Sequence, residues 1–283
     1  MHSVNHLLFS SGSVLTISYI GALMELDTSG ILSQITKYSG VSAGAIIATC
    51  LAIGYTLQEL KDIVMKMDFA SVQDIGEESP IHLLELYGFD SGEKLLRFIR
   101  ALLKVKGYGD TTTFMDLSSA GCPQLVMWAT ELESGTLRRF SAADTPSYTI
   151  CGALRASVSI PILFAPILAE DTGHLLIDGG VLNHYPIAYL AEDEREGVLG
   201  FYARNITTYD SPTDIVDYLK AFIGLILRSK NDDTPDIFRE KTILIETEPV
   251  TSAASFSLST EYKIALIEKG AASAKKWLAE REL

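Results

Sequence analysis

Apolar positions recur along the chain in two spacings, short strand-like runs and longer helical stretches that alternate with them. The short runs predict strands over residues 7–10, 35–38, 124–129, 137–140, 175–177, 198–202 and 242–246. The helical spacing predicts helices over residues 14–26, 45–53, 56–67, 93–103, 214–227 and 260–279. Residues 77–92, which contain Pro80, Gly88 and Gly92, are predicted to form a loop. Because no repeat or low-complexity linker interrupts this alternation, we expect one α/β domain over residues 1–283.

Composition and charge narrow the class of protein. The chain is 47% hydrophobic and 21% charged, which is typical of a globular protein with a sizeable core. A net charge of −13 argues against nucleic-acid binding and against broad attraction to anionic membranes. No Lys or Arg precedes Lys37, no apolar run approaches the length of a bilayer span, and the three cysteines lack metal-ligand spacing. We therefore expect a cytoplasmic protein, with peripheral membrane association or non-classical export as alternatives.

Ser42 lies at the centre of the run Gly40-Val41-Ser42-Ala43-Gly44, between a predicted strand and a predicted helix. A strand–turn–helix of this kind lifts a serine hydroxyl clear of the backbone, where a base can take its proton. The glycines at positions 40 and 44 support such a turn because they allow a tight backbone. The alternative interpretation is a serine that caps the helix N-terminus.

Asp178 ends an apolar strand and is followed by Gly179 and Gly180. A partly desolvated carboxylate at such a turn can accept the proton of a serine hydroxyl, because burial raises its basicity. A plain Asp-Gly turn is the alternative interpretation. His174 and His184 flank Asp178, so a Ser-His-Asp triad remains a further alternative.

Taken together, these segments resemble the patatin-like phospholipase family. Its G-x-S-x-G nucleophile motif matches residues 40–44, and its D-G-G block matches residues 178–180, followed here by an Asn and a Pro. Its R-A-S-x-x-x-P segment, its A-T-(D/E)-x-x-x-G hairpin and its C-terminal boundary are similar to residues 155–161, 129–135 and 255–258. These blocks come in family order and cover nearly the whole chain, which makes the resemblance far more specific than any one motif.

The resemblance implies a three-layer α/β/α fold with a mostly parallel central sheet. It also implies a catalytic dyad, in which Ser42 is the nucleophile and Asp178 is the general base. The implied activity is hydrolysis of acyl esters in phospholipids or other lipids, through an acyl-enzyme and without a metal or organic cofactor. An activating protein partner is compatible with the resemblance. A histidine-dependent esterase or acyltransferase is the alternative enzyme.

The turn expected to bind the oxyanion departs from the family pattern. The family commonly has G-G-G-x-(K/R)-G, and residues 11–16 match it only at Gly12, with Leu15 in place of the basic residue. Backbone N–H groups of Gly12, Ser13 and Val14 are the expected donors. Arg155 is a candidate for the missing positive charge, and a structural ion pair is its alternative role. The altered turn leaves open a catalytically weak or inactive protein that binds lipid or a protein partner.

Two apolar segments bear on the substrate. Residues 160–169 can line an acyl-chain groove, although such runs more often form part of a core. The helix predicted over residues 214–227 has an apolar face formed by Ile215, Leu219, Phe222, Ile223 and Ile226, with Lys220 and Arg228 nearby. This face can contact a membrane surface transiently, but packing on the sheet is the favoured interpretation.

Overall fold

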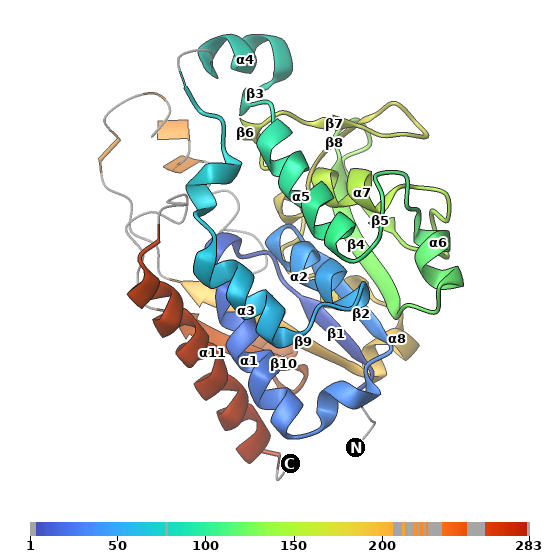
Figure 1. Ribbon diagram of the computed structural model, residues 1–283, viewed down its shortest axis with the longest axis vertical. Coiled ribbons are helices and arrows are strands. Elements are labelled where there is room, and N and C mark those ends of the chain that lie inside the picture. Colours follow the sequence, from blue (N-terminus) through green and yellow to red (C-terminus); the bar gives the residue numbers. More distant parts are fainter. Residues whose placement is uncertain are drawn as a thin grey trace.

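An eight-stranded sheet lies at the centre of the computed structural model, which describes residues 4–76, 79–205, 211–212, 215, 218–219, 221–222, 225, 234–247 and 258–281 (Figure 1). The strand order is β10 (Thr242–Thr247), β9 (Val198–Asn205), β1 (His6–Phe9), β2 (Lys37–Val41), β4 (Gln124–Glu131), β8 (Leu175–Asp178) and β7 (Ile167–Leu168), with β5 (Thr136–Phe140) paired to β4. The first five strands are parallel, whereas β5 and β8 run antiparallel to β4 and β7 runs antiparallel to β8. Strands β3 (Gly88–Asp90) and β6 (Ile162–Phe164) form a separate pair.

Helices connect the strands and cover the sheet. The α-helices are α1 (Ile17–Thr28), α2 (Ala43–Ala52), α3 (Leu57–Lys66), α4 (Ser79–Leu86), α5 (Glu93–Val105), α6 (Phe114–Ser119), α7 (Ile150–Ser157), α8 (Glu192–Glu196), α10 (Thr234–Ile237) and α11 (Thr260–Ala279). Short 3-10 helices are η1 (Ser13–Thr16), η2 (Ile31–Gln34), η3 (Phe69–Val72), η4 (Gly179–Val181), η5 (Pro186–Tyr189) and η6 (Arg239–Lys241).

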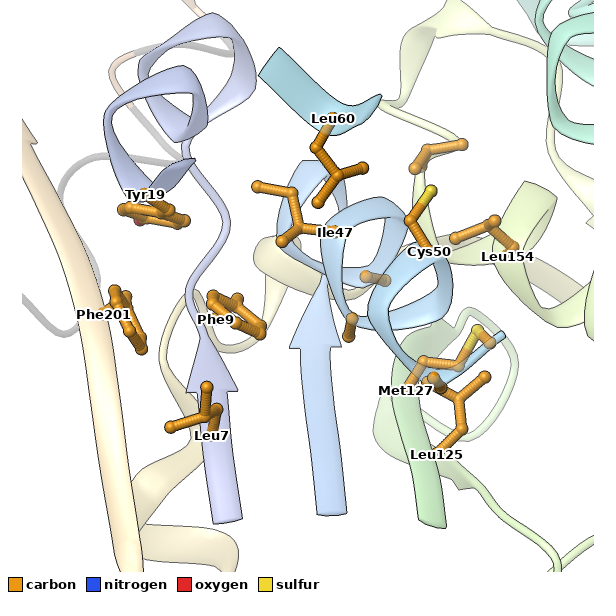
Figure 2. Packing of buried hydrophobic residues seen from close by; sticks show 14 of the residues in the cluster. Leu7, Phe9, Tyr19, Ile47, Cys50, Leu60, Leu125, Met127, Leu154 and Phe201 are labelled. Atoms are coloured by element: carbon orange, nitrogen blue, oxygen red, sulfur yellow. The ribbon is translucent and has the colours of Figure 1, made fainter. Parts of the chain in front are cut away.

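The period-two alternation of the strands divides the core between the two faces of the sheet. On β1, Leu7 and Phe9 pack into the larger cluster with the long helices, whereas Leu8 packs into a second cluster on the opposite face. Figure 2 shows the first of these faces, where Phe9 and Met127 point from the strands toward α2. Short elements, among them η5, cover the other face. The three-layer arrangement with a mostly parallel sheet is therefore confirmed.

Local sequence signals place the helix boundaries. At the start of α3, Thr56 Oγ1 accepts the N–H of Glu59 at 3.2 Å, and the Glu59 carboxylate accepts the N–H of Thr56 at 2.7 Å. Ser259 caps α11 by accepting the N–H of Tyr262 at 3.2 Å. These side chains satisfy N–H groups that a helix start leaves unpaired, so the predicted starts of both helices are confirmed.

The structure corrects two predictions of local structure. The loop predicted over residues 77–92 contains α4 and β3, because Pro80 lies in the first turn of a helix, where its missing N–H costs nothing. The strand predicted over residues 35–38 is shifted to Lys37–Val41, the stretch that pairs with both β1 and β4. Parts of two other expected features, residues 255–257 and positions 220, 223, 226 and 228, lie outside the described residues.

Candidate active site

Ser42 occupies the sharp turn between β2 and α2. Its backbone has φ 54° and ψ −127°, a region that L-residues rarely adopt, so the surrounding structure holds the turn under strain. Although Ser42 is at the N-cap position of α2, its side chain makes no capping hydrogen bond. The hydroxyl bonds Asp178 instead, so the capping interpretation is wrong.

The glycines on either side of Ser42 are required by close backbone approach. A Cβ at Gly40 would lie 2.3 Å from the carbonyl oxygen of Gly44, and a Cβ at Gly44 would lie 2.5 Å from the carbonyl oxygens of Phe9 and Ser10. Gly44 therefore lets the first turn of α2 contact the end of β1 directly. This contact brings the turn that follows β1 beside Ser42.

Strand β4 aligns Ser42 with Asp178. Val41 pairs with Trp128, and Asp178 pairs with the next residue, Ala129, so both site residues are placed by neighbouring positions of one strand. The Ser42 hydroxyl donates a hydrogen bond to Asp178 Oδ2 at 2.5 Å, across 136 positions of sequence. Both side chains are buried, with 6% of Ser42 and 2% of Asp178 exposed. The structure thus brings the two predicted residues into direct contact.

Asp178 lies in surroundings that favour a base. Its Oδ1 accepts the backbone N–H of Gly180 at 2.7 Å, while the Thr130 hydroxyl donates to its carbonyl oxygen at 3.0 Å. Burial raises the pKa of Asp178 to about 7, and the hydrogen bonds from Ser42 and Gly180 lower it in part. A Cβ at Gly179 would lie 2.6 Å from the carbonyl oxygen of Trp128, so this turn also needs its glycine. The carboxylate can accept a proton near neutral pH.

The turn expected to bind the oxyanion has a strained serine where glycine is usual. Ser13 has φ 48°, and the Thr16 hydroxyl donates to its carbonyl oxygen at 2.8 Å. No hydrogen bond within the described residues engages the N–H groups of Gly12, Ser13 and Val14. Leu15 is a buried apolar residue, and position 15 therefore supplies no positive charge to the site.

A network of hydroxyl groups and one histidine holds this turn in place. Tyr19 accepts the N–H of Ala203 at 3.0 Å, and its hydroxyl lies 2.7 Å from that of Ser10. The next residue, Ser11, donates its N–H to the carbonyl of His184 at 2.9 Å, and its Oγ lies 3.1 Å from His184 Nδ1. His184 follows the Asp-Gly-Gly block, so the oxyanion turn and the Asp178 turn are joined directly.

An apolar cavity of about 140 Å³ adjoins Ser42 on the helical side of the sheet. Ser13 and Val14 line it together with Ser42, and the remaining walls come mainly from apolar side chains of α2, α3 and α5. Of the predicted groove segment, Ile160 and Phe164 line the cavity, while Leu163 and Ala169 are core residues. Ser42 therefore adjoins a space that suits a hydrocarbon chain.

Comparisons with known proteins decide the family. The family model for patatin-like phospholipases matches residues 7–191, which is more than half of the chain. The chain belongs to the patatin-like phospholipase family.

An uncharacterised protein of Acanthamoeba polyphaga mimivirus is 29% identical over 284 residues, covering 96% of this chain and 93% of that protein. A probable lipid hydrolase of Invertebrate iridescent virus 6 is 27% identical over 181 residues, 64% of this chain and 61% of that protein. VipD from Legionella pneumophila shares the fold, with a TM-score of 0.63 at 20% identity, covering 98% of this chain and 67% of VipD.

Arg155 of this patatin-like protein is fully buried and has a structural set of contacts. Its guanidinium donates to Ser159 Oγ at 2.5 Å, to the carbonyl of Ala165 at 3.1 Å and to the carbonyl of Ser91 at 3.2 Å. Burial lowers the pKa of this guanidinium to about 10, with Asp90 and Glu93 opposing the shift. These contacts join α7 to the β3–β6 pair. None of the three hydrogen bonds reaches the turn at Gly12–Val14, so Arg155 does not replace the missing charge there.

In the patatin-like site, neither His174 nor His184 has a hydrogen bond to Ser42 of the kind that a Ser-His-Asp triad requires among the contacts of the described residues. Asp178 itself accepts the hydrogen bond of Ser42. His184 Nδ1 is beside Ser11, and His174, which is 47% exposed, has its Nδ1 3.4 Å from Glu131. The geometry thus pairs the serine with a carboxylate directly.

Sequence reasoning missed Ser157, although it lies in the quoted R-A-S segment. The N–H of Ser42 donates to Ser157 Oγ at 2.9 Å, and that hydroxyl donates to the carbonyl of Trp128 at 2.6 Å. Its position beside Arg155 in a family motif was the available signal. Tyr19 was missed as well, and nothing in its sequence context distinguishes it from an ordinary core tyrosine.

The described residues hold no cluster of three or more His, Cys, Asp or Glu side chains arranged as metal ligands. In that same part of the chain, no helix is both long and apolar enough to cross a bilayer. Cys50 and Cys151 are buried thiols, and Cys122 is partly buried.

Proposed function

We propose that this protein hydrolyses acyl esters of lipids through a dyad of Ser42 and Asp178. The observation that carries the proposal is the 2.5 Å hydrogen bond from the Ser42 hydroxyl, which lines an apolar cavity, to Asp178. Family membership and the similarity to a probable lipid hydrolase support lipid hydrolysis in general.

The reaction proceeds in two steps. Asp178 takes the hydroxyl proton as Ser42 Oγ attacks the ester carbonyl, and collapse of the tetrahedral intermediate expels the alcohol, which takes up that proton. The acyl-enzyme is then hydrolysed when Asp178 takes a proton from water, and the fatty acid leaves as Ser42 regains its hydroxyl proton. In both steps the N–H groups of Gly12, Ser13 and Val14 stabilise the negative oxygen. The apolar cavity holds the acyl chain.

Labelling with a fluorophosphonate probe tests the nucleophile without knowledge of the substrate. We expect wild-type protein to be labelled, with loss of labelling in Ser42→Ala. Ser134→Ala is the matched control, because Ser134 is an exposed serine in the β4–β5 turn. Turnover of a short-chain ester should fall by roughly 10²- to 10⁴-fold in Asp178→Asn, since the base is lost. Equal labelling of wild type and Ser42→Ala would refute the proposal.

A second candidate is a lipid-binding protein with weak activity. Leu15 in place of the usual basic residue and the strained Ser13 favour it, because both weaken stabilisation of an anion. Ester turnover that is the same in wild type and Ser42→Ala, together with binding of fatty acids, would favour this candidate. An activating protein partner remains a prediction, which is tested by measuring ester turnover with and without added cell extract.

We also propose transient contact with a lipid surface. On α4, Ile81 and Leu84 are 54% and 82% exposed, and Tyr87 just after it is 64% exposed. Helix α4 lies at the top of the molecule in Figure 1, and it follows η3, whose Phe69 and Val72 line the cavity. The net charge of −13 favours zwitterionic over anionic surfaces. Sedimentation with phosphatidylcholine vesicles should weaken in Leu84→Glu and remain unchanged in the exposed control Leu132→Glu.

A further inference from the structure

The residues of α2 that line the cavity beside Ser42 indicate how far it extends along this helix. Ala43, Ile46, Ile47 and Cys50 line it and share one face of the helix, because from Ala43 onward they recur at three- and four-residue spacing. With a rise of about 1.5 Å per residue, the eight steps from Ser42 to Cys50 span about 12 Å. The cavity therefore runs beside two turns of α2, starting at the nucleophile.

Three of the side chains that line the cavity are buried and come from three different helices. Cys50, Leu60 and Leu102 come from α2, α3 and α5, line the cavity, and are 2%, 5% and 7% exposed. The Tyr55 hydroxyl, just after α2, donates to the carbonyl of Leu102 at 2.9 Å. This bond fixes the end of α5 to the end of α2. Figure 2 shows Cys50 and Leu60 on the helical side of the sheet, near Ile47.

We infer that Cys50, Leu60 and Leu102 form a floor that limits the acyl chain to medium length, about that of an octanoyl or decanoyl group. An extended chain of eight to ten carbons is similar in length to the stretch of α2 from Ser42 to Cys50, whereas a palmitoyl chain is considerably longer. A chain that exceeds the floor must bend back toward Ser42 or displace core side chains, and close-packed interiors resist such displacement. This inference rests on the proposed function, since the ester carbonyl must be held at Ser42.

The test compares turnover of p-nitrophenyl butyrate, octanoate, laurate and palmitate. Wild type should prefer octanoate over palmitate in kcat/KM by about tenfold or more. Leu60→Ala and Leu102→Ala should each raise the palmitate-to-octanoate ratio by about tenfold, because they deepen the cavity. Leu26→Ala is the matched control, since Leu26 is a fully buried residue of α1 that does not line the cavity. If neither deepening variant folds, Cys50→Leu should shift the preference from octanoate toward butyrate.

A binding measurement separates this inference from the proposed function. Calorimetry with the Ser42→Ala protein should show tighter binding of octanoate or decanoate than of palmitate. Ester turnover with no chain-length preference, or an equal change of the ratio in Leu26→Ala, overturns the floor and leaves the hydrolase intact. Selective binding of medium chains without any ester turnover supports the floor and overturns the hydrolase. Absence of both turnover and fatty-acid binding overturns both.

Discussion

Ser157 Oγ accepts the backbone N–H of Ser42 at 2.9 Å. The same hydroxyl donates to the carbonyl of Trp128 at 2.6 Å, and Trp128 pairs with Val41, the residue before the nucleophile. One serine on α7 therefore ties the strained turn to the central strand β4. Because the Ser42 backbone has φ 54°, it stays in place only while such contacts hold it.

Replacing Ser157 with Ala should lower kcat by about 10- to 100-fold, because small misplacement of a nucleophile is costly. The substitution leaves the buried N–H of Ser42 without its partner, so the free energy of unfolding should fall by about 1–3 kcal/mol. Ester hydrolysis and urea unfolding measure the two effects. Ser39→Ala is the control. Ser39 lies three positions before the nucleophile, is equally buried, and forms a hydrogen bond with His6. A similar loss of kcat in both variants would contradict a specific role for Ser157.

The pH dependence of turnover should report Asp178. Burial raises the pKa of this carboxyl to about 7, and only the ionised form can accept the Ser42 proton. We therefore expect kcat/KM to rise with pH through an apparent pKa near 7 and then level off. A profile that stays flat from about pH 5 to pH 9 would exclude Asp178 as the base.

Asp178 should also cost the protein stability at neutral and alkaline pH. Its pKa is raised in the folded state, so between its ordinary value and about 7 the folded protein binds more protons than the unfolded chain. Stability from this group therefore falls as pH rises through that window. Asp178→Asn removes the charge while its carbonyl can still accept the Gly180 N–H, so it should be more stable at pH about 8, on the order of 1–3 kcal/mol. The gain should shrink toward pH about 4; an equal gain at both pH values would point to another cause.

The contact between Ser42 and Asp178 could be predicted because both residues carry recognisable surroundings. A nucleophile turn needs glycines on both sides, and Gly40 and Gly44 indeed have no room for a Cβ. The proximity itself came from the resemblance to a family. It depends on the register of β4, which aligns Val41 and Asp178 through long-range pairing that local patterns do not contain.

The wrong or missing predictions have a common physical origin. The buried place of Arg155 and the role of Ser157 depend on how α7 packs, and sequence spacing carries no information on this packing. Gly and Pro usually interrupt helices and so predict a loop over residues 77–92, but Pro80 lies where a helix tolerates it. Sequence reasoning thus finds a long, strongly periodic helix such as α5 more readily than a short helix or the exact ends of an element.

Helices α1 and α11 cross so closely that two glycines are required. A Cβ at Gly21 would lie 1.8 Å from the carbonyl oxygen of Ile267, and a Cβ at Gly270 would lie 1.7 Å from that of Ser18. Either Gly→Ala change should lower the free energy of unfolding by about 3 kcal/mol or more, because the helices must separate. Chemical denaturation measures the loss. Gly109→Ala is the control, since nothing lies within 4 Å of its Cβ position; a loss of similar size there would discount the crossing.

In the oxyanion turn, we expect the Thr16 hydroxyl to hold the strained backbone of Ser13, where the family pattern has a glycine. Ser13 has φ 48°, and the Thr16 hydroxyl holds its carbonyl at 2.8 Å, which keeps the N–H groups of Ser13 and Val14 in place. Thr16→Val should lower kcat by about tenfold with little change in KM, since an oxyanion donor acts mainly in the transition state. In a Ser13→Gly background the backbone adopts this conformation without strain, so the same change should cost less than about threefold. Thr16→Ser keeps the hydroxyl and should retain wild-type turnover. Measuring kcat for the single and double variants decides the point, because equal losses in both backgrounds would mean that the Thr16 hydroxyl does not hold the strained turn.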